Sequence, residues 1–399
     1  MMSKLIKWIL RGFGGLLAFV VGLVVVLMLA IWVADPTVLR NLVFGQSPLD
    51  PAGVEKSQPQ EWVRGAPRDD IPLGAPEGIS AAGLAAAEAY AEQTGSVALL
   101  VWHRGALRYE KYWPGFDRGT RTNPNSMHKT VLGLTVGAAI ADGYIESANV
   151  PASRWITEWQ NDARRDITVR QLLQMASGLE IPIFGTWKSA RILFGSDLAA
   201  GVLGLGSVEP AGSRFQYSNA NSQLLLLLVE RATGQRYSRY LSERLWKRLG
   251  AADAALWMDH PGGLPRGFCC LFASARDWLR VGRLFLDRGR VGADEVIPAT
   301  WIDEMVTPSP GNPNFGLHVW LGSPPQTERL YNDFTIKAFH SRPFEAKDVI
   351  FIDGFGGQRV YVVPSLDLIV VRTGKSTTDW DDAVLPNALI TAIAREVEP

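Results

Sequence analysis

The sequence predicts a single α+β domain that follows an N-terminal transmembrane helix. Strand patterns occur near both ends of the chain and helical periods dominate between them, so distant segments complete one sheet around a helical insertion. An uncharged apolar run of 23 residues stands close to the N-terminus. The 399 residues are 47% apolar, which supports a substantial packed core.

The first 34 residues predict a membrane anchor. Residues 1–11 carry three basic side chains, and residues 12–34, "GFGGLLAFVVGLVVVLMLAIWVA", carry no charge. As a helix this run reaches roughly 35 Å, which exceeds the hydrocarbon core of about 30 Å. The positive-inside rule places residues 1–11 in the cytoplasm and the chain after Asp35 in the periplasm or outside the cell.

A cleaved signal peptide is the alternative for the same run. Signal peptides typically have an apolar core of about 7–15 residues and small residues at the cleavage site. Here the run is longer and ends in "AIWVAD", with bulky residues where small ones are needed. We therefore favour an uncleaved anchor, which predicts a single-pass protein of the inner (cytoplasmic) membrane.

The segment after the anchor leads into the domain. Residues 35–75 are rich in Pro, Gly, Asp and Gln without sustained periodicity, and this composition predicts a stalk or an extended wrap over the domain surface. The domain then spans residues 76–399. Residues 78–95 have the composition and length of a helix, and residues 96–115 predict a β-hairpin that turns at Arg104-Gly105.

Helical periods and loops dominate from about residue 141 to 290. Strand patterns return in "FGLHVWLG", "DVIFIDGFGGQRVYVVP" and "LDLIVVRTG", and the last two predict a hairpin around residues 364–367. The segment "DAVLPNALITAIAREV" closes the chain as a helix. The helical region is therefore inserted between two strand-bearing parts of one domain.

Charge, cysteine and histidine content exclude several classes of function. The 40 basic and 40 acidic residues give a formal net charge of zero, which leaves no electrostatic footprint for nucleic acid. Cys269 and Cys270 are the only cysteines, and such neighbours rarely pair because the bond strains the backbone. The five histidines are scattered without metal-type spacing. We expect no metal, no cofactor and no nucleic-acid partner.

The stretch "NSMHKTVLGLTVGAAIA" places Ser126 three residues before Lys129 at the start of a predicted helix, so both side chains share one face. A serine hydroxyl needs a neighbouring base to become a nucleophile. Lysine is such a base when burial lowers its pKa, and the apolar helix body predicts burial. The helix N-terminus also lowers a lysine pKa and offers N–H groups to an oxyanion.

The alternative interpretation is a capped helix with an exposed lysine, although the chain contains one such motif and it opens a helix. His128 projects about 100° away from Lys129 around the helix. We interpret His128 as support or surface, not as a catalytic base.

Tyr217-Ser218-Asn219 precedes a second apolar helix, "SQLLLLLVE". A tyrosine or its anion near a serine can shuttle protons between nucleophile and leaving group. Asn219 can orient a lysine or a substrate amide through hydrogen bonds. The alternative is a helix N-cap at Ser218 or Asn219, which is compatible with catalysis. Ser147-Ala148-Asn149 has the same S-x-N form but is interpreted as a loop.

A third pattern is "IDGFGGQRVYVVP". Glycines inside a strand let another backbone or a ligand come close. An edge strand at this place would offer an N–H as the second oxyanion donor. A β-bulge is the alternative interpretation of the same glycines.

The order of the three patterns resembles the serine β-lactamase and penicillin-binding protein superfamily. Within it the chain is similar to the class C β-lactamase-related hydrolases, which include family VIII carboxylesterases and 6-aminohexanoate-dimer hydrolases. Residues 167–179, 215–234 and 268–289 resemble further signature stretches of that group. The resemblance covers about residues 78–399. It implies a β-lactamase/transpeptidase-like fold, with an antiparallel sheet flanked by helices, an all-helical region, and the site between them.

The resemblance also implies roles for individual residues. Ser126 would accept the acyl group, Lys129 would be its base, and Tyr217 would shuttle the proton. Asn219 would belong to the substrate-binding side of the site.

The oxyanion hole would consist of the amides of Ser126 and Phe355, if Gly354 aligns with the last glycine of the family's K-T-G-type motif. A second register moves the donor to Gln358. Arg372-Thr373-Gly374 looks more like K-T-G but lies beyond the hairpin turn and is rejected.

We predict a membrane-anchored serine hydrolase that cleaves ester or amide bonds of small substrates through an acyl-enzyme on Ser126. The alternatives are a β-lactamase or D-amino-acid-specific peptidase, and a non-catalytic binding or penicillin-sensing protein of the same fold. Few residues precede the apolar run, too few for a cytoplasmic signalling domain. The presence of Ser126, Lys129 and Tyr217 argues against a catalytically inactive scaffold.

Penicillin-recognising relatives place a Lys or His at the K-T-G-type position, where it engages the substrate carboxylate. Here neither register offers one, and Asp353 stands nearby. Repulsion between Asp353 and a substrate carboxylate predicts weak β-lactam turnover and better hydrolysis of short-chain esters or small linear amides. Arg359 is the alternative source of a cation.

Overall fold

A six-stranded antiparallel sheet lies at the centre of the computed structural model, in the order β3-β2-β14-β13-β12-β9. Two strands come from the first third of the chain and the others from its last quarter. They are β2 (Ser96–His103), β3 (Ala106–Tyr112), β9 (Trp320–Leu321), β12 (Ile350–Gly354), β13 (Gln358–Val363) and β14 (Leu368–Gly374). The pairing of β14 with β2 confirms that distant segments complete one sheet.

The structure describes residues 2–45, 50–329, 331–333 and 338–397. Met1 of the expected cytoplasmic segment, residues 46–49 of the expected stalk or wrap, and residues 398–399 of the expected domain lie outside the described residues.

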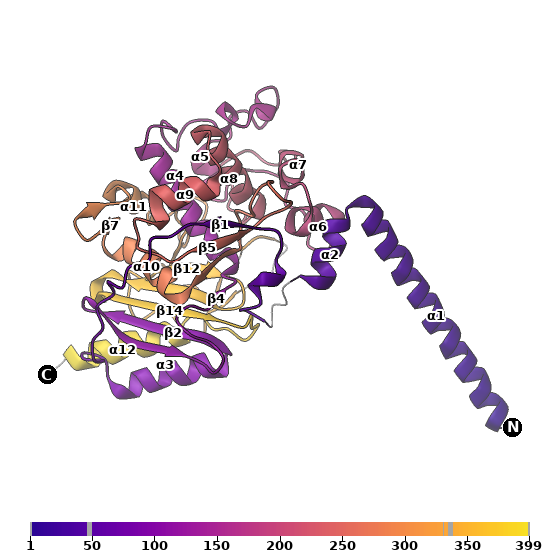
Figure 1. Ribbon diagram of the computed structural model, residues 1–399, viewed down its shortest axis with the longest axis horizontal. Coiled ribbons are helices and arrows are strands. Elements are labelled where there is room, and N and C mark those ends of the chain that lie inside the picture. The colour runs from indigo at the N-terminus through magenta and orange to yellow at the C-terminus, as the bar shows by residue number, and fades with distance from the viewer. Residues whose placement is uncertain (1, 46–49, 330, 334–337, 398–399) are drawn as a thin grey trace.

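Helices cover both faces of the central sheet. The helices α3 (Ala81–Gln93) and α12 (Val384–Val397) pack together on the outer face, and α10 (Ala275–Leu286) lies on the inner face against β2, β13 and β14 (Figure 1). Alternate side chains of β2 enter the two cores, because successive residues of a strand point to opposite faces. Leu99 and Val101 join the α3/α12 core, whereas Leu100 joins the α10 core.

A helical region lies over the inner face of the sheet (Figure 1). Its helices are α4 (His128–Ala141), α5 (Val169–Leu173), α6 (Trp187–Phe194), α7 (Leu198–Leu203), α8 (Asn219–Thr233), α9 (Tyr237–Leu241) and α11 (Ala299–Met305). The short helical turns are η1 (Val54–Lys56), η2 (Asn125–Met127), η3 (Ala152–Arg154), η4 (Thr157–Trp159), η5 (Ser242–Trp246, a π-helical turn) and η6 (Pro364–Leu366).

A second sheet of four strands interrupts the region that the sequence predicted to be mainly helical. Its order is β1-β5-β6-β4, with β1 (Gln60–Val63), β4 (Arg121–Thr122), β5 (Ala254–Trp257) and β6 (Leu271–Ser274). Both β5 and β6 are short and buried throughout, so they lack the alternation that marks a strand in a sequence. Two-stranded ribbons complete the list: β7 (Arg290–Val291) with β8 (Asp294–Glu295), and β10 (Glu328–Arg329) with β11 (Ala338–Phe339).

The N-terminal part consists of α1 (Met2–Ala34), which projects away from the domain, and α2 (Pro36–Phe44), which lies against it (Figure 1). Within α1, Gly15–Ala34 is long and apolar enough to cross a membrane, with a mean hydropathy of 3.1 and no burial. Asp35 caps α2 through the Thr37 amide and also accepts a hydrogen bond from the Ser196 amide at 2.9 Å. Further on, β1 pairs with β5, so this part of the chain follows the domain surface.

The glycine-containing segment near the C-terminus differs from the expected single edge strand. It forms two strands, β12 and β13, joined by a turn in which Gly356 and Gly357 have φ values of +74° and +84°. Only glycine adopts such values readily, so the glycines mark a turn and not a bulge within a strand. The strand β9 pairs with only the first two residues of β12, Ile350 and Phe351, so that side of residues 352–354 has no strand partner among the described residues.

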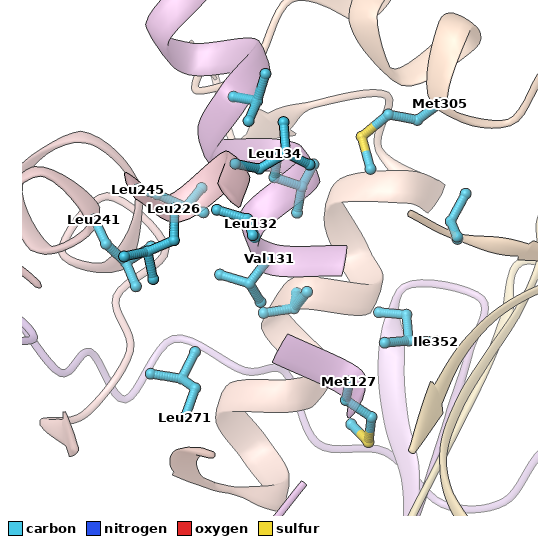
Figure 2. Packing of buried hydrophobic residues seen from close by; sticks show 14 of the residues in the cluster. Met127, Val131, Leu132, Leu134, Leu226, Leu241, Leu245, Leu271, Met305 and Ile352 are labelled. Atoms are coloured by element: carbon cyan, nitrogen blue, oxygen red, sulfur yellow. The ribbon is translucent and has the colours of Figure 1, made fainter. Parts of the chain in front are cut away.

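The helix α4 packs between the central sheet and the helical region. Every residue from His128 to Ala139 is buried. Figure 2 shows three side chains of α4 close to leucines of the helical region: Val131, Leu132 and Leu134 with Leu226, Leu241 and Leu245. Met127, the residue just before α4, lies on the side of Ile352 in the sheet. The predicted burial of the helix that follows Ser126 is therefore confirmed.

Candidate active site

Ser126 lies in the 3₁₀ turn η2 that leads directly into α4. The preceding Asn125 has a φ of +50°, a left-handed conformation that asparagine tolerates better than most residues. Its side-chain amide donates a hydrogen bond to the Phe355 carbonyl at 2.9 Å. This bond ties the Ser126 turn to the β12–β13 turn and leaves Ser126 half-buried at the start of the helix.

Lys129 is 2% exposed, and its ammonium nitrogen has three partners. Nζ lies 2.9 Å from Ser126 Oγ, 2.9 Å from Asn219 Oδ1 and 2.7 Å from the Phe268 carbonyl. These partners come from η2, from the first turn of α8, and from the loop before β6. The structure thus brings together Ser126, Lys129 and Asn219, as the sequence predicted.

Burial lowers the pKa of Lys129 from 10.5 to about 7, and the carboxylate of Asp353 opposes this shift. A neutral amine has two N–H groups and one lone pair. The Asn219 oxygen and the Phe268 carbonyl can only accept, so they take the two N–H groups. The lone pair of Lys129 is then left for the hydroxyl of Ser126, which is the arrangement that a general base needs.

Tyr217 lies beside both Ser126 and Lys129. Its hydroxyl interacts with the Ser126 side chain, and its ring centroid lies 4.9 Å from Lys129 Nζ. Burial raises the pKa of Tyr217 well above 10.0, with a further contribution from Asp353. Tyr217 therefore carries its proton at neutral pH, which favours tyrosine over its anion as the shuttle.

The segment around Tyr217 is held on both sides. Ser218 caps α8 by accepting a hydrogen bond from the Ala220 amide at 3.2 Å, so the N-cap interpretation is confirmed and coexists with the site. The Tyr217 amide donates to the Tyr331 carbonyl at 2.7 Å. The Tyr217 ring stacks on Trp320 with centroids 5.8 Å apart.

Gly354 and Phe355 abut the turn that carries Ser126. A Cβ atom on Gly354 would lie 2.1 Å from the Pro124 carbonyl oxygen, so only glycine allows this approach. The side chain of Gln358 is bonded to Gly374 by hydrogen bonds of 2.7 and 2.9 Å, which do not involve the backbone amide of the second register. The close approach of Gly354 to the Ser126 turn is the contact that the first register requires.

Asp353 belongs to a buried network that the sequence analysis missed. Its carboxylate meets Arg359 at 2.5 Å, Arg329 at 3.3 Å and the Tyr331 hydroxyl at 2.8 Å. Asp382 contacts the same two arginines, Arg329 at 2.9 Å and Arg359 at 2.6 Å. Two acids and two guanidinium groups cancel, so the alternative in which Arg359 supplies a cation is confirmed and the expected repulsion by Asp353 is wrong.

A narrow crevice lies beside these groups. Its lining includes Ser126, Lys129 and Tyr217, the aromatic side chains of Phe315 and Trp320, and His318, Thr130 and Asp353. The described residues contain no group of three His, Cys, Asp or Glu side chains placed to hold a metal ion. The chemistry of the crevice is therefore that of a serine with a buried lysine beside it.

The cysteines differ from the sequence-based expectation. Cys269 and Cys270 form a disulfide between neighbours, although neighbouring cysteines were expected to stay unpaired. Cys270 has a φ of +72°, a backbone conformation that residues other than glycine rarely adopt. Unusual backbone geometry of this kind was the reason for expecting no bond between the two cysteines. Cys269 follows Phe268, whose carbonyl binds Lys129.

Comparisons with known proteins agree with this geometry. Residues 82–394 match the Beta-lactamase family, which is most of the chain. The chain belongs to the Beta-lactamase family. The resemblance and the β-lactamase/transpeptidase-like fold that the sequence predicted are both confirmed, and the chain stands among the serine hydrolases of this fold.

Among curated relatives, 6-aminohexanoate-dimer hydrolase of Paenarthrobacter ureafaciens is 29% identical over 231 residues, which cover 54% of this chain and 58% of that protein. Protein flp of Staphylococcus aureus is 26% identical over 148 residues, which cover 33% of this chain and 28% of flp. The matches thus span little more than half of the first relative's length and less of the second's.

Solved structures show the same fold at low sequence identity. A Bacillus anthracis protein described as a 6-aminohexanoate-dimer hydrolase has a TM-score of 0.72 and 19% identity, with 90% of this chain and 98% of that chain covered. EstCE1, described as a hydrolase with promiscuous acyltransferase activity, has a TM-score of 0.60 and 14% identity, with 78% and 99% covered.

The lowered pKa of Lys129 predicts the pH dependence of turnover. Lys129 must be neutral to accept a proton, so kcat/KM for an ester substrate rises with pH along an acid limb centred near pH 7. Lys129→Ala lowers kcat by about 10²–10⁴-fold. Lys188→Ala, at a surface lysine paired with Glu180, is the matched control and leaves the profile unchanged. A limb centred near pH 10 in the native protein would contradict this account.

Tyr217→Phe removes the hydroxyl that meets Ser126 and keeps the ring that stacks on Trp320. We expect kcat to fall by about 10²–10⁴-fold while the melting temperature stays the same. Tyr144→Phe, at a tyrosine that is 41% exposed, serves as the control. Near-native turnover of the Tyr217 variant would refute the role of its hydroxyl.

Proposed function

We propose that this chain is a membrane-anchored serine hydrolase that cleaves ester or amide bonds of small substrates through an acyl-enzyme on Ser126. The observation that carries the proposal is the buried amine of Lys129, 2.9 Å from Ser126 Oγ, with its other partners limited to hydrogen-bond acceptors. A surface lysine beside a serine would stay protonated and could not act as a base.

In the first step, Lys129 takes the proton of Ser126 while Oγ forms a bond to the substrate carbonyl carbon. The carbonyl oxygen gains the electron pair of the broken π bond and faces the amides of Ser126 and Phe355, which serve as the oxyanion donors. Tyr217 then gives its proton to the leaving oxygen or nitrogen as the bond to the acyl carbon breaks, and it regains a proton from Lys129.

In the second step, water attacks the acyl carbon and loses a proton to the same pair of side chains. The bond between the acyl carbon and Ser126 Oγ breaks, Oγ recovers its proton, and the acid leaves. Asn219 holds the amine of Lys129 in place through both steps.

The walls of the crevice beside Ser126 support substrates with an apolar acyl group. Phe315 and Trp320 form aromatic walls that suit such a group. The name of the Paenarthrobacter ureafaciens relative points to a linear amide, and that of EstCE1 to acyl transfer. Because Arg329 and Arg359 neutralise Asp353, we base the preference for esters and linear amides over β-lactams on these apolar walls and on the names of the relatives, and not on repulsion.

Labelling and turnover of the full-length protein in detergent test this function. We expect a fluorophosphonate probe to label Ser126, and Ser126→Ala to abolish both labelling and hydrolysis of p-nitrophenyl butyrate; Ser147→Ala, in a surface loop, is the control. Equal labelling of Ser126→Ala would refute the nucleophile. A kcat/KM for nitrocefin equal to or above that for the ester would instead support the β-lactamase alternative.

We also propose that α1 anchors the protein in the cytoplasmic membrane with the domain on the periplasmic or extracellular side. Support comes from the unburied apolar run Gly15–Ala34 and from the basic residues before it. The disulfide between Cys269 and Cys270 suits an oxidising compartment, where such bonds persist.

The intact mass of the membrane-extracted protein tests the anchor. We expect it to include residues 1–34 and the protein to stay in the membrane fraction after an alkaline carbonate wash. Protease added to spheroplasts is expected to digest the domain. A mature N-terminus close to Asp35 would show that the segment is a cleaved signal peptide.

A further inference from the structure

Three carbonyl groups of the segment 266–269 face the first turn of α4. The Phe268 carbonyl lies 2.7 Å from Lys129 Nζ, and the Cys269 and Arg266 carbonyls lie 2.7 and 3.3 Å from His128 Nδ1. A carbonyl only accepts hydrogen bonds, so His128 Nδ1 carries a proton and donates it. We name residues 265–270 the carbonyl strap.

Buried polar side chains hold the carbonyl strap from its other side. Arg266 is fully buried and donates to the Leu193 and Gly195 carbonyls at 3.0 Å each. Gln223 is also fully buried, and its Oε1 accepts from the Gly267 amide at 2.9 Å. Polar groups are costly to bury unless each finds a partner, so these bonds hold residues 266 and 267 at the start of the strap. The bond that holds the strap beyond Phe268 is the one between the Cys269 carbonyl and His128.

His128 lies in the first turn of α4 and links this helix to the carbonyl strap by hydrogen bonds. It is fully buried, and its Nε2 lies 3.0 Å from the Tyr237 hydroxyl, which donates to it. Burial lowers the pKa of His128 to about 4, so the ring is neutral and adds no positive charge beside Lys129. Neither the triad of catalytic groups nor substrate contact accounts for this histidine.

We propose that His128 is a positioning residue that holds the carbonyl strap so that the Phe268 carbonyl keeps one N–H of Lys129 and the lone pair stays aimed at Ser126. The proposal rests on the proposed function of Lys129 as the base. If the bond between His128 and the strap is lost, the Phe268 carbonyl moves and the amine turns or admits water.

The groups around Lys129 set the sign of the expected effect. Tyr217 and His318 face it in their uncharged forms, and Asp353 is the nearest carboxylate. Because burial is the largest cause of the lowered pKa, entry of water raises the pKa of Lys129 and moves the acid limb of kcat/KM to higher pH.

Two amide substitutions of His128 separate positioning from general stability. His128→Asn places its amide nitrogen where Nδ1 donates to the strap, whereas His128→Gln places it near Nε2, toward Tyr237. In the full-length protein we expect His128→Gln to lose about 10²-fold in kcat, as for a misplaced catalytic group, with an acid limb above pH 7. We expect His128→Asn to stay within a few-fold of the native protein and to keep its limb.

Tyr237→Phe is the structural control, since it removes the partner of Nε2 and leaves the strap bond. It lowers the melting temperature without moving the limb. If His128→Gln does not fold, Gly267→Ala is the second variant that displaces the carbonyl strap, because its Cβ would lie 2.9 Å from the Leu226 side chain. This proposal would be overturned if His128→Gln and Gly267→Ala kept the kcat and the acid limb of the native protein while Ser126 was still labelled. That result would leave the proposed function intact.

Discussion

The removal of one lysine amine from water is the constraint on which the rest of the site depends. Lys129 is buried because α4 is packed between the central sheet and the helical region, and burial brings its pKa down to about 7. An amine in such a place needs fixed partners, and these come from α8 and from the loop before β6. The base therefore exists only when the sheet, the helical region and the carbonyl strap are assembled together.

The surroundings of Lys129 are kept free of other uncompensated charge. The two histidines nearest to it, His128 and His318, are neutral because burial lowers their pKa values to about 4 and about 3. The carboxylate of Asp353 is shared between two arginines that also bind Asp382. In the proposed mechanism, transfer of the Ser126 proton to Lys129 places a positive charge beside the developing oxyanion, and the low polarity of the site strengthens their attraction.

The sequence was sufficient for the features that depend on local pattern. Spacing on one helix face placed Ser126 with Lys129, and loop position before an apolar helix located Tyr217 and Asn219. It was insufficient where long-range pairing decides the outcome. Arg359 could be named as a partner of Asp353 because it is close in the chain, whereas Arg329 and Asp382 are distant and carry no motif. The pairing of β9 with the start of β12 likewise depends on tertiary packing, which no local pattern records.

The most direct test of the account is the titration of Lys129 itself, followed by NMR in the full-length protein with lysine labelled with ¹³C at Cε. The Lys129→Ala variant identifies the signal. The account predicts a midpoint near pH 7 for this signal. A midpoint for Lys129 close to 10.5, its ordinary value, would show that the amine stays charged at neutral pH and would contradict its role as the base.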